Sequence, residues 1–453
     1  MFLSFNSKPI AIMRTRRDFL KFSTLSAVAT TVSPKLILPA KKPVILLRSS
    51  WNDANIGDQG HTPGTLRLLQ RYAPEAEILL WHQVARPETE QIITKNFPTV
   101  KIVRGDFYDG DKPFEGEVKE AFDRANLYIV NSGMVYNYGL FGYDWPGTLA
   151  NLTPFYYCLD RGVPFGLYGQ SFDKFAHPAM PVFKDVFSRA AFIYTRDDES
   201  RKFLKENSFK PGVLEFGPDG CFGIDVRDEE KGLRYLKKAG LEDRKFLVVV
   251  IRTNTRHVYD TGKGSLMNPA QPTPAQQEQD RVRLAGIREL ITTWVRETGL
   301  KVLLAPEVSK EVAQARTGVY DQLPAGVQSK VVWRGTYWNA DEAMSVYARA
   351  HSMFGIEPHS LIMGLALGVP VVHARALSHG RKGWMFRDIG LSEWLFDIDQ
   401  STAADWAKQL LAIHRDYPGA KEKVRKAMDF VQKRQAATMQ VVRKTVGIEV
   451  GKD

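Results

Sequence analysis

Two clusters of polar residues have the types and spacing that a ligand site requires. The first cluster, Asn55, Gly57 and Asp58, follows an apolar run at 43–47 and precedes a helix-like segment. Free backbone N–H groups at a helix start attract anions, and Asn55 and Asp58 can also hydrogen-bond sugar hydroxyls. Gly57 permits a backbone conformation with positive φ. The alternative interpretation is that this loop only caps the helix.

The second cluster contains Glu357, His359 and Ser360 and follows an apolar run at 352–356. The pattern predicts His359 at the start of a helix, where an imidazole can act as a general acid or bind an anion. The helix dipole disfavours imidazolium at that position, so a neutral histidine with a structural hydrogen bond is the alternative.

The elements that must position these clusters form two similar series. Strand-length apolar runs alternate with helix-like segments from residue 43 to 225, and a second series begins with the run at 246–251. This alternation predicts two α/β halves in tandem, each with a mostly parallel, doubly wound sheet. Such pairs bind their ligand at the carboxyl ends of the strands, in the cleft between the halves.

The expected boundaries follow from these series. They are 1–40 for a signal peptide and linker, 41–225 and 226–400 for the two domains, and 401–453 for C-terminal helices. An amphipathic basic helix at 419–446 is predicted to dock back across the domain junction, and a membrane-surface helix is the alternative. A long polar loop at 256–280 is typical of a functional lid or a disordered segment.

Composition narrows the function classes. The chain has 453 residues with a formal net charge of +11 and no blocks of Lys and Arg, which disfavours nucleic acid and favours small acidic substrates. No glycine-rich phosphate fingerprint is present, so NAD and ATP enzymes are poor alternatives. Two cysteines, Cys158 and Cys221, are too few for a disulfide scaffold, and two buried thiols are the default. No metal site is expected, because the histidine spacings match no familiar ligand motif.

The N-terminus resembles a twin-arginine (Tat) export signal. Arg16 and Arg17 lie in a basic stretch, a short apolar segment follows, and 27–29 offers the small residues that a signal peptidase accepts. The pattern predicts export of the folded protein by the Tat translocase to the periplasm or another extracytoplasmic location. An amphipathic first helix is the alternative, and the cleavage site and the oligomeric state stay open.

Several short motifs, taken in order, resemble the polysaccharide pyruvyl transferase family over about residues 45 to 400. The motifs are Asn55-x-Gly57-Asp58, Gly169-Gln170-Ser171, Tyr194-Thr195-Arg196-Asp197, Gly217-Pro218-Asp219, His359-Ser360 and the basic pair Arg381-Lys382. The resemblance implies a glycosyltransferase-B-like fold of two facing Rossmann-like domains. It also implies transfer of a pyruvyl group from phosphoenolpyruvate to a sugar of an envelope or extracellular polysaccharide.

In the terms of this resemblance, His359 is the expected catalytic acid and Asp58 orients the acceptor hydroxyl. The expected partners are a carbohydrate acceptor and an anionic small-molecule donor, with phosphoenolpyruvate as co-substrate and no further cofactor. The residues expected to bind substrate are Asn55, Gly57, Gln170, Arg196, Arg252, Glu357, Ser360, Arg381 and Lys382.

One departure from the family pattern bears on the donor. Glu357 stands where the family usually has an arginine, two residues before the histidine. Its carboxylate would repel a trianionic donor by about 1 to 4 kcal/mol at ~4 Å, unless Arg381 or Lys382 pairs with it. Export also separates the protein from cytoplasmic phosphoenolpyruvate. The alternatives are therefore a related enzyme with a different donor, or a non-catalytic glycan-binding protein that uses the aromatic loop at 134–147.

Overall fold

The computed structural model describes residues 42–49, 53–82, 86–107, 114–139, 144–254, 272–377 and 380–449. All of them belong to one unit, Lys42–Asp453. The expected export signal, residues 140–143 of the aromatic loop and most of the polar loop at 256–280 lie outside the described residues. Among the described helices, none has the length and apolar character that a membrane crossing needs.

The first sheet is built from seven parallel strands. They are β1 (Val44–Ser49), β2 (Glu77–His82), β3 (Lys101–Val103), β4 (Leu127–Gly133), β5 (Phe165–Gln170), β6 (Phe192–Thr195) and β7 (Leu214–Phe216). Their order is β3-β2-β1-β4-β5-β6-β7, and every neighbouring pair is parallel. Alternate residues of β1 enter two separate apolar cores, Ile45 and Leu47 in one and Val44 and Leu46 in the other. The sheet is therefore covered on both faces, as its continuous apolar runs predict.

Helices connect the strands of this first half. They are α1 (Ile56–Tyr72), α2 (Pro87–Asn96), α3 (Glu117–Arg124), α4 (Trp145–Arg161), α5 (Ala179–Phe187) and α6 (Asp198–Glu206). Strand β1 lies between β2 and β4, so the strand order reverses there. Helix α1 follows β1 at this switch point, the usual ligand position in an open α/β sheet.

The second sheet repeats this order with six parallel strands. They are β8 (Phe246–Val250), β9 (Lys301–Ala305), β10 (Val331–Trp333), β11 (Ser352–Gly355), β12 (Val371–Arg375) and β13 (Leu395–Asp397). The order is β10-β9-β8-β11-β12-β13. The helices of this half are α7 (Glu229–Ala239), α8 (Pro274–Thr298), α9 (Glu311–Gly318), α10 (Ala325–Gln328), α11 (Ala340–Tyr347), α12 (Pro358–Ala366), α13 (Met385–Asp388) and α14 (Ala403–Arg415). The expectation of two Rossmann-like sheets is confirmed, whereas the domain boundary at residue 225 stays a prediction.

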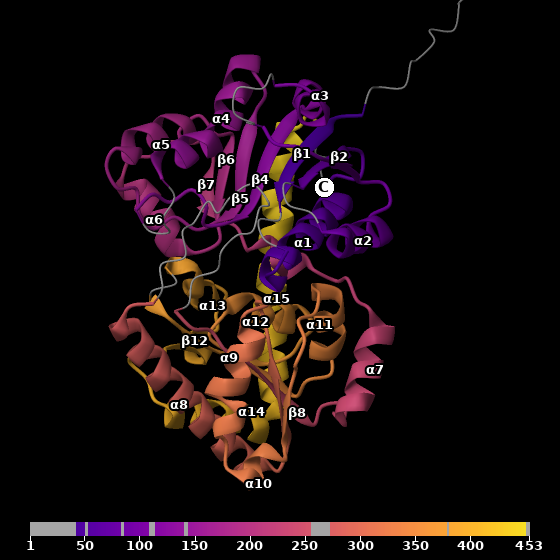
Figure 1. The fold of residues 1–453 in the computed structure, drawn as a ribbon. Helices are drawn as coiled ribbons and strands as arrows, with labels where there is room; N and C mark the ends of the chain where they lie inside the picture. Colours follow the sequence, from indigo (N-terminus) through magenta and orange to yellow (C-terminus); the bar gives the residue numbers. More distant parts are fainter. Residues whose placement is uncertain are drawn as a thin grey trace, which may run out of the picture. The chain divides into compact units, whose positions relative to one another are not determined.

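The last helix, α15 (Tyr417–Thr445), contacts both halves and is the long yellow helix in Figure 1. It packs with α14 and α12 of the second half and with α1 of the first. Arg443 donates a 2.6 Å hydrogen bond to the carbonyl of Tyr72, and the hydroxyls of Thr438 and Tyr168 lie 3.0 Å apart. The predicted docking of the C-terminal helix across the junction is therefore confirmed.

The two cysteines belong to different cores. Cys158 is buried in the core that contains Val44, and Cys221 in the core that contains Ile45. Both are free thiols, as the default interpretation predicted.

Candidate active site

Two helix starts from different halves meet at the site. Asn55 caps α1, its side chain accepting a hydrogen bond from the backbone of Gly57 at 2.8 Å, while α12 follows β11 with Glu357 at its cap. A Cβ placed on Gly57 would lie 2.6 Å from Nδ1 of His359. Gly57 does not adopt the positive φ that a glycine permits, because the residue lies inside α1 with ordinary helical backbone. The glycine is required there for the close approach of α12.

His359 is buried and lies between residues of both halves. Its Nδ1 lies 3.3 Å from Oε1 of Glu307, and its Nε2 lies 3.3 Å from a guanidinium nitrogen of Arg196. A guanidinium only donates, so Nε2 accepts and Nδ1 carries the hydrogen that bonds Glu307. Burial, aided by the nearby charge of His61, lowers the pKa of His359 to about 3. The ring is therefore neutral near pH 7, and its role as acid stays a prediction.

Glu307 was not identified in the sequence. It lies just beyond the end of β9 and is fully buried, and its second carboxylate oxygen accepts the backbone N–H of Ser360 at 2.8 Å. Burial and the charge of Glu357 raise the pKa of Glu307 to about 7. The signal available was its position, an acidic residue after the carboxyl end of a strand. Glu311 on α9 is also buried, and burial raises its pKa to about 8.

Asp58 and His61 project from the first turns of α1. Asp58 is 9% exposed, and its Oδ1 lies 3.8 Å from Nδ1 of His61. Its Oδ2 makes no hydrogen bond with any described residue. Burial raises the pKa of Asp58. Asp58 was predicted from the sequence as a site residue, whereas His61, three residues further along the same helix face, was not.

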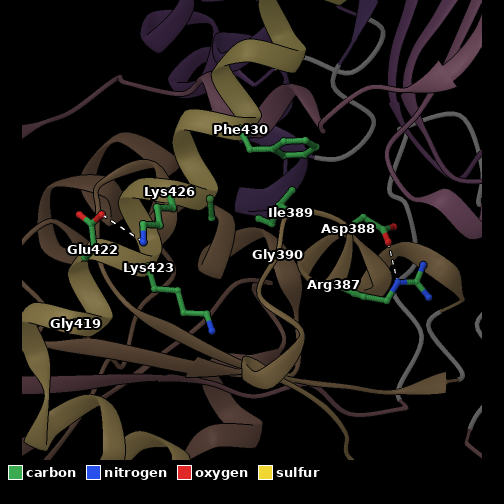
Figure 2. A pocket seen from close by; sticks show the side chains of 10 residues that line it. Arg387, Asp388, Ile389, Gly390, Gly419, Glu422, Lys423, Lys426 and Phe430 are labelled. Atoms are coloured by element: carbon green, nitrogen blue, oxygen red, sulfur yellow. Dashed lines mark hydrogen bonds and ion pairs between the residues drawn. The ribbon is translucent and has the colours of Figure 1, made fainter.

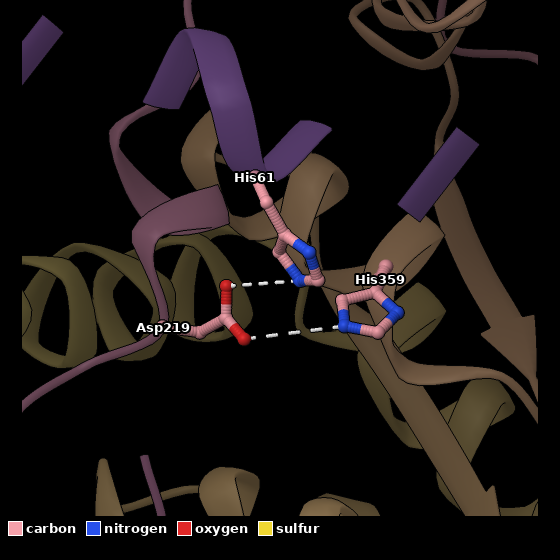
Figure 3. A group of neighbouring side chains, drawn as sticks. All are labelled: His61, Asp219 and His359. Atoms are coloured by element: carbon pink, nitrogen blue, oxygen red, sulfur yellow. Dashed lines mark ion pairs between the residues drawn. The ribbon is translucent and has the colours of Figure 1, made fainter. Parts of the chain in front are cut away.

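Asp219 faces both histidine rings from one side, with one carboxylate oxygen toward each ring, as Figure 3 shows. Its Oδ1 is 3.4 Å from Nε2 of His61, and its Oδ2 is 2.7 Å from Arg196 and 4.0 Å from Nε2 of His359. Burial alone would raise the pKa of Asp219, but His61 and Arg196 outweigh that effect and hold the pKa well below its usual value. Asp219 belongs to a motif that carried the resemblance, yet it was not named as a site residue.

Residues at the ends of β5 and β6 hold Arg196 in place by hydrogen bonds. Arg196 also donates from Nε to Ser171 at 2.8 Å, and the hydroxyl of Ser171 donates to Asp197 at 2.6 Å. Gln170 is fully buried, and its amide donates to the backbone carbonyl of Ser132. In this structure Gln170 therefore fixes the end of β4, and its expected contact with substrate stays a prediction.

Glu357 is almost fully buried between two cations. Its Oε2 lies 2.8 Å from Lys382, and its Oε1 lies 3.3 Å from Arg252, which also pairs with Glu311 at 3.3 Å. Arg381 points elsewhere and pairs with Asp173 at 3.3 Å. Of the two partners considered for Glu357, the structure brings only Lys382 to it.

The family model for polysaccharide pyruvyl transferases matches residues 55–375, which includes every site residue described so far except Arg381 and Lys382. The chain belongs to the polysaccharide pyruvyl transferase family. No curated protein sequence gave a significant match.

Solved structures of sugar-nucleotide proteins resemble this pyruvyl transferase family member in fold. S. aureus MnaA with UDP aligns at a TM-score of 0.55 and 9% identity, covering 91% of this chain and 99% of that one. UDP-GlcNAc 2-epimerase from Neisseria meningitidis with UDP-GlcNAc gives 0.52 and 10%, covering 89% and 100%. Anabaena Alr3699/HepE with UDP and glucose gives 0.51 and 11%, covering 90% and 99%. At these identities the likeness supports the glycosyltransferase-B-like fold alone.

Among the described residues of this family member, two groups of side chains are close enough to hold a metal ion. Their ligand atoms lie within 4.8 Å of one another, and the groups are His61 with Asp219 and His359, and Glu307 with Glu357 and His359. Each group already contacts a cation of the protein, Arg196 in the first and Lys382 in the second. A metal ion would add positive charge beside these side chains, so we assign no metal to either group.

Two further features lie apart from this site. At the two described ends of the aromatic loop, the rings of Tyr138 and Trp145 pack edge to face at 5.4 Å and are half-buried, and the use of this loop as a sugar platform stays a prediction. A pocket of about 770 Å³ lies beside α15, where Phe430 is exposed (Figure 2). Arg387 at this pocket pairs with Asp388, and Lys426 with Glu422. None of the residues lining the pocket belongs to the active site.

Proposed function

We propose that this protein transfers a pyruvyl or related group to a hydroxyl of a sugar in an envelope or extracellular polysaccharide. Membership of the family and the glycosyltransferase-B-like fold support a transferase. The observation that carries the proposal is the hydrogen-bonded pair of His359 and Glu307, buried where helix starts of both halves meet. A buried imidazole oriented by a carboxyl group is suited to moving the proton of an attacking hydroxyl.

The geometry favours a proton-accepting role for His359. A neutral ring whose Nδ1 hydrogen faces Glu307 can take a proton at Nε2 and pass the Nδ1 proton to the carboxylate. Glu307 can hold that proton, because burial and Glu357 raise its pKa to about 7, whereas the pKa of His359 is about 3. Oδ2 of Asp58 is buried without a hydrogen bond to any described residue and suits a hydrogen bond from the acceptor hydroxyl.

The charge of the site bears on the donor. Arg196, Arg252 and Lys382 all contact carboxylates in this structure, so an anionic donor must compete with Asp219 and Glu357 for them. This competition is the reason to keep a related donor as a second candidate, such as a sugar nucleotide. The proposal includes export by the Tat system and function outside the cytoplasm, with a carbohydrate acceptor and no cofactor beyond the donor.

Ligand-induced shifts in melting temperature separate the donors. A ligand at 100 times its Kd stabilises the folded state by about 2.7 kcal/mol, so phosphoenolpyruvate should raise the melting temperature and UDP-sugars should not. Mass spectrometry of candidate acceptor oligosaccharides then detects pyruvyl transfer. Stabilisation by a UDP-sugar alone would instead favour the second candidate.

The role of His359 is tested in the same assay. His359→Ala should abolish transfer, while His351→Ala, a change at a buried histidine bonded to His414 outside the site, should retain it. Full product formation by a folded His359→Ala protein would remove His359 from the mechanism.

A further inference from the structure

We propose that His61 is a second proton-transfer residue of this site, the donor that works opposite the acceptor His359. The inference rests on the proposed function. His61 comes from α1 in the first half and His359 from α12 in the second. Their rings meet edge to face, with centroids 4.7 Å apart and planes at 85° (Figure 3).

The surroundings of His61 suit a ring with hydrogen on both nitrogens. Three titratable groups face it: Asp58 from its own helix, Asp219 from the loop after β7, and His359 from α12. Nε2 lies 3.4 Å from Asp219 and Nδ1 lies 3.8 Å from Asp58. An ionised carboxylate only accepts, and Asp219 is kept ionised by His61 and Arg196.

The buried ring of His61 also lacks the hydrogen bonds that a purely structural histidine usually makes. The side chain is 1% exposed, and neither ring nitrogen makes a hydrogen bond with a described residue. Leaving a buried polar group without a hydrogen bond is destabilising. His82 is also buried without a hydrogen bond to a described residue, but His61 lies beside His359 where α1 and α12 meet, the position of a residue retained for chemistry.

The two histidines have opposite environments. Asp219 holds Nε2 of His61, whereas Arg196 faces Nε2 of His359. Burial keeps His359 neutral, as its lowered pKa of about 3 indicates. When the surroundings of two titratable groups differ in charge, one group is suited to act as the acid and the other as the base. Here His61, beside a carboxylate, is suited to donate a proton, and His359, beside a guanidinium, to accept one.

The proton balance of a pyruvyl ketal follows from this division. Nδ1 of His61, the nitrogen that Asp219 does not hold, gives its proton to the methylene carbon of an enol phosphate, and the electron pair of the double bond forms the new C–H bond. The first sugar hydroxyl attacks the adjacent carbon, forms a C–O bond and releases its proton to His359. The second sugar hydroxyl attacks the same carbon and forms the second C–O bond, while the bond from that carbon to the phosphate oxygen breaks and its electron pair leaves with the phosphate. The proton of this hydroxyl returns to Nδ1 of His61. Phosphate leaves with the proton from His359.

Nitrogen-15 NMR of the histidines tests the charge states without any substrate. At pH 6 we expect hydrogen on both nitrogens of His61 and on only one nitrogen of His359, with signals assigned from His61→Gln and His359→Gln. Asp219→Asn should shift His61 towards the neutral form. A neutral His61 in the wild type at pH 6 would overturn the inference, whatever the activity of the enzyme.

Kinetics test the donor step itself. His61→Gln should lower kcat for transfer by about 10²- to 10⁴-fold with little change in the KM of the donor. The matched control is His82→Gln, because His82 is equally buried in the same half and lies 3.5 Å from Asp53. Equal kcat values for His61→Gln and wild type would overturn the inference about His61 and leave the proposed function standing. A wild type that transfers no pyruvyl group would overturn the proposed function and the donor step together, although a charged His61 would still stand.

Discussion

Replacing Gly57 with alanine tests whether the contact between α1 and α12 sets the position of His359. The added Cβ would lie 2.6 Å from Nδ1 and 2.7 Å from Cβ and Cγ of the histidine. Carbon atoms in favourable contact lie about 3.5–4.0 Å apart, so the two groups must separate by about 1 Å. The ring has little freedom to turn away, because Glu307 and Arg196 hold its two nitrogens.

The size of the effect follows from this displacement. Overpacking of a buried contact costs about 1–3 kcal/mol of unfolding free energy. A misplacement of about 1 Å in a catalytic group costs about 10²-fold in rate. We therefore expect Gly57→Ala to lose far more activity than its loss of stability alone explains, provided that the assay temperature leaves the variant folded.

Thermal unfolding and initial rates of transfer, measured on the same preparations, check both effects. The matched control is Gly326→Ala in α10, where a Cβ meets nothing within 4 Å. Alanine is the better helix former, so this control should be neutral or up to about 1 kcal/mol more stable. A Gly57→Ala protein with wild-type rate and stability would show that the helices yield freely and that the close approach does not position His359.

Three further changes probe the charges and the C-terminal helix. Burial raises the pKa of Glu311 to about 8 from 4.5, so the folded protein keeps a proton that the unfolded chain releases, and the unfolding free energy falls as the pH rises from 4.5 towards 8. Glu311→Gln should flatten that fall, which urea unfolding at pH 5 and pH 8 measures. Glu357→Gln should increase the affinity for phosphoenolpyruvate, measured by calorimetry, because it frees Arg252 and Lys382 from the Glu357 carboxylate. Unchanged affinity would contradict the idea that the donor competes with Glu357 for these cations. Arg443→Ala should lower the unfolding free energy by about 1 kcal/mol, since it removes a hydrogen bond between α15 and Tyr72. Arg425→Ala breaks exposed pairs within α15 and should leave the unfolding free energy nearly unchanged.

The fold was predictable because its signals are local. The buried strand at Phe246–Val250 is a continuous apolar run, and such runs separated by amphipathic segments define parallel sheets without further information. The stripe of Val431, Met439 and Val442 likewise predicted that the last helix must cover a core.

The site was predictable only in part, because its contacts join segments far apart in the chain. Asp58 and His359 were selected since each lies at a helix start after a strand. Glu307 and His61 were not predicted, because the position of a glutamate after β9 or of a histidine in the first turns of α1 is by itself a weak signal. Their significance arises from distances of 3.3 Å to His359 and 3.4 Å to Asp219.

The structural role of Gly57 could not be predicted for a related reason. A glycine in a polar loop suggests a positive φ, but the packing of α12 against α1 makes the missing Cβ the deciding property. That property depends on the other half of the molecule, so the residues around Gly57 carried no signal for it.

The balance of charge at the site sets how its donor affinity should depend on pH. Among the described residues, the site brings together Arg196, Arg252 and Lys382 with Asp58, Asp219, Glu307, Glu311 and Glu357. Carboxyl groups outnumber cations, yet burial raises the pKa of Glu307 to about 7 and of Glu311 to about 8, so both bind protons at lower pH. The cations then face chiefly Asp219 and Glu357, and an anion can bind.

As the pH rises through 7 and 8, Glu307 and Glu311 ionise. The affinity for phosphoenolpyruvate, measured by calorimetry, should then fall by about tenfold or more, since 1.4 kcal/mol of added repulsion suffices. Glu307→Gln should remove most of the fall near pH 7, and an affinity independent of pH between 6 and 9 would refute this account of the donor site.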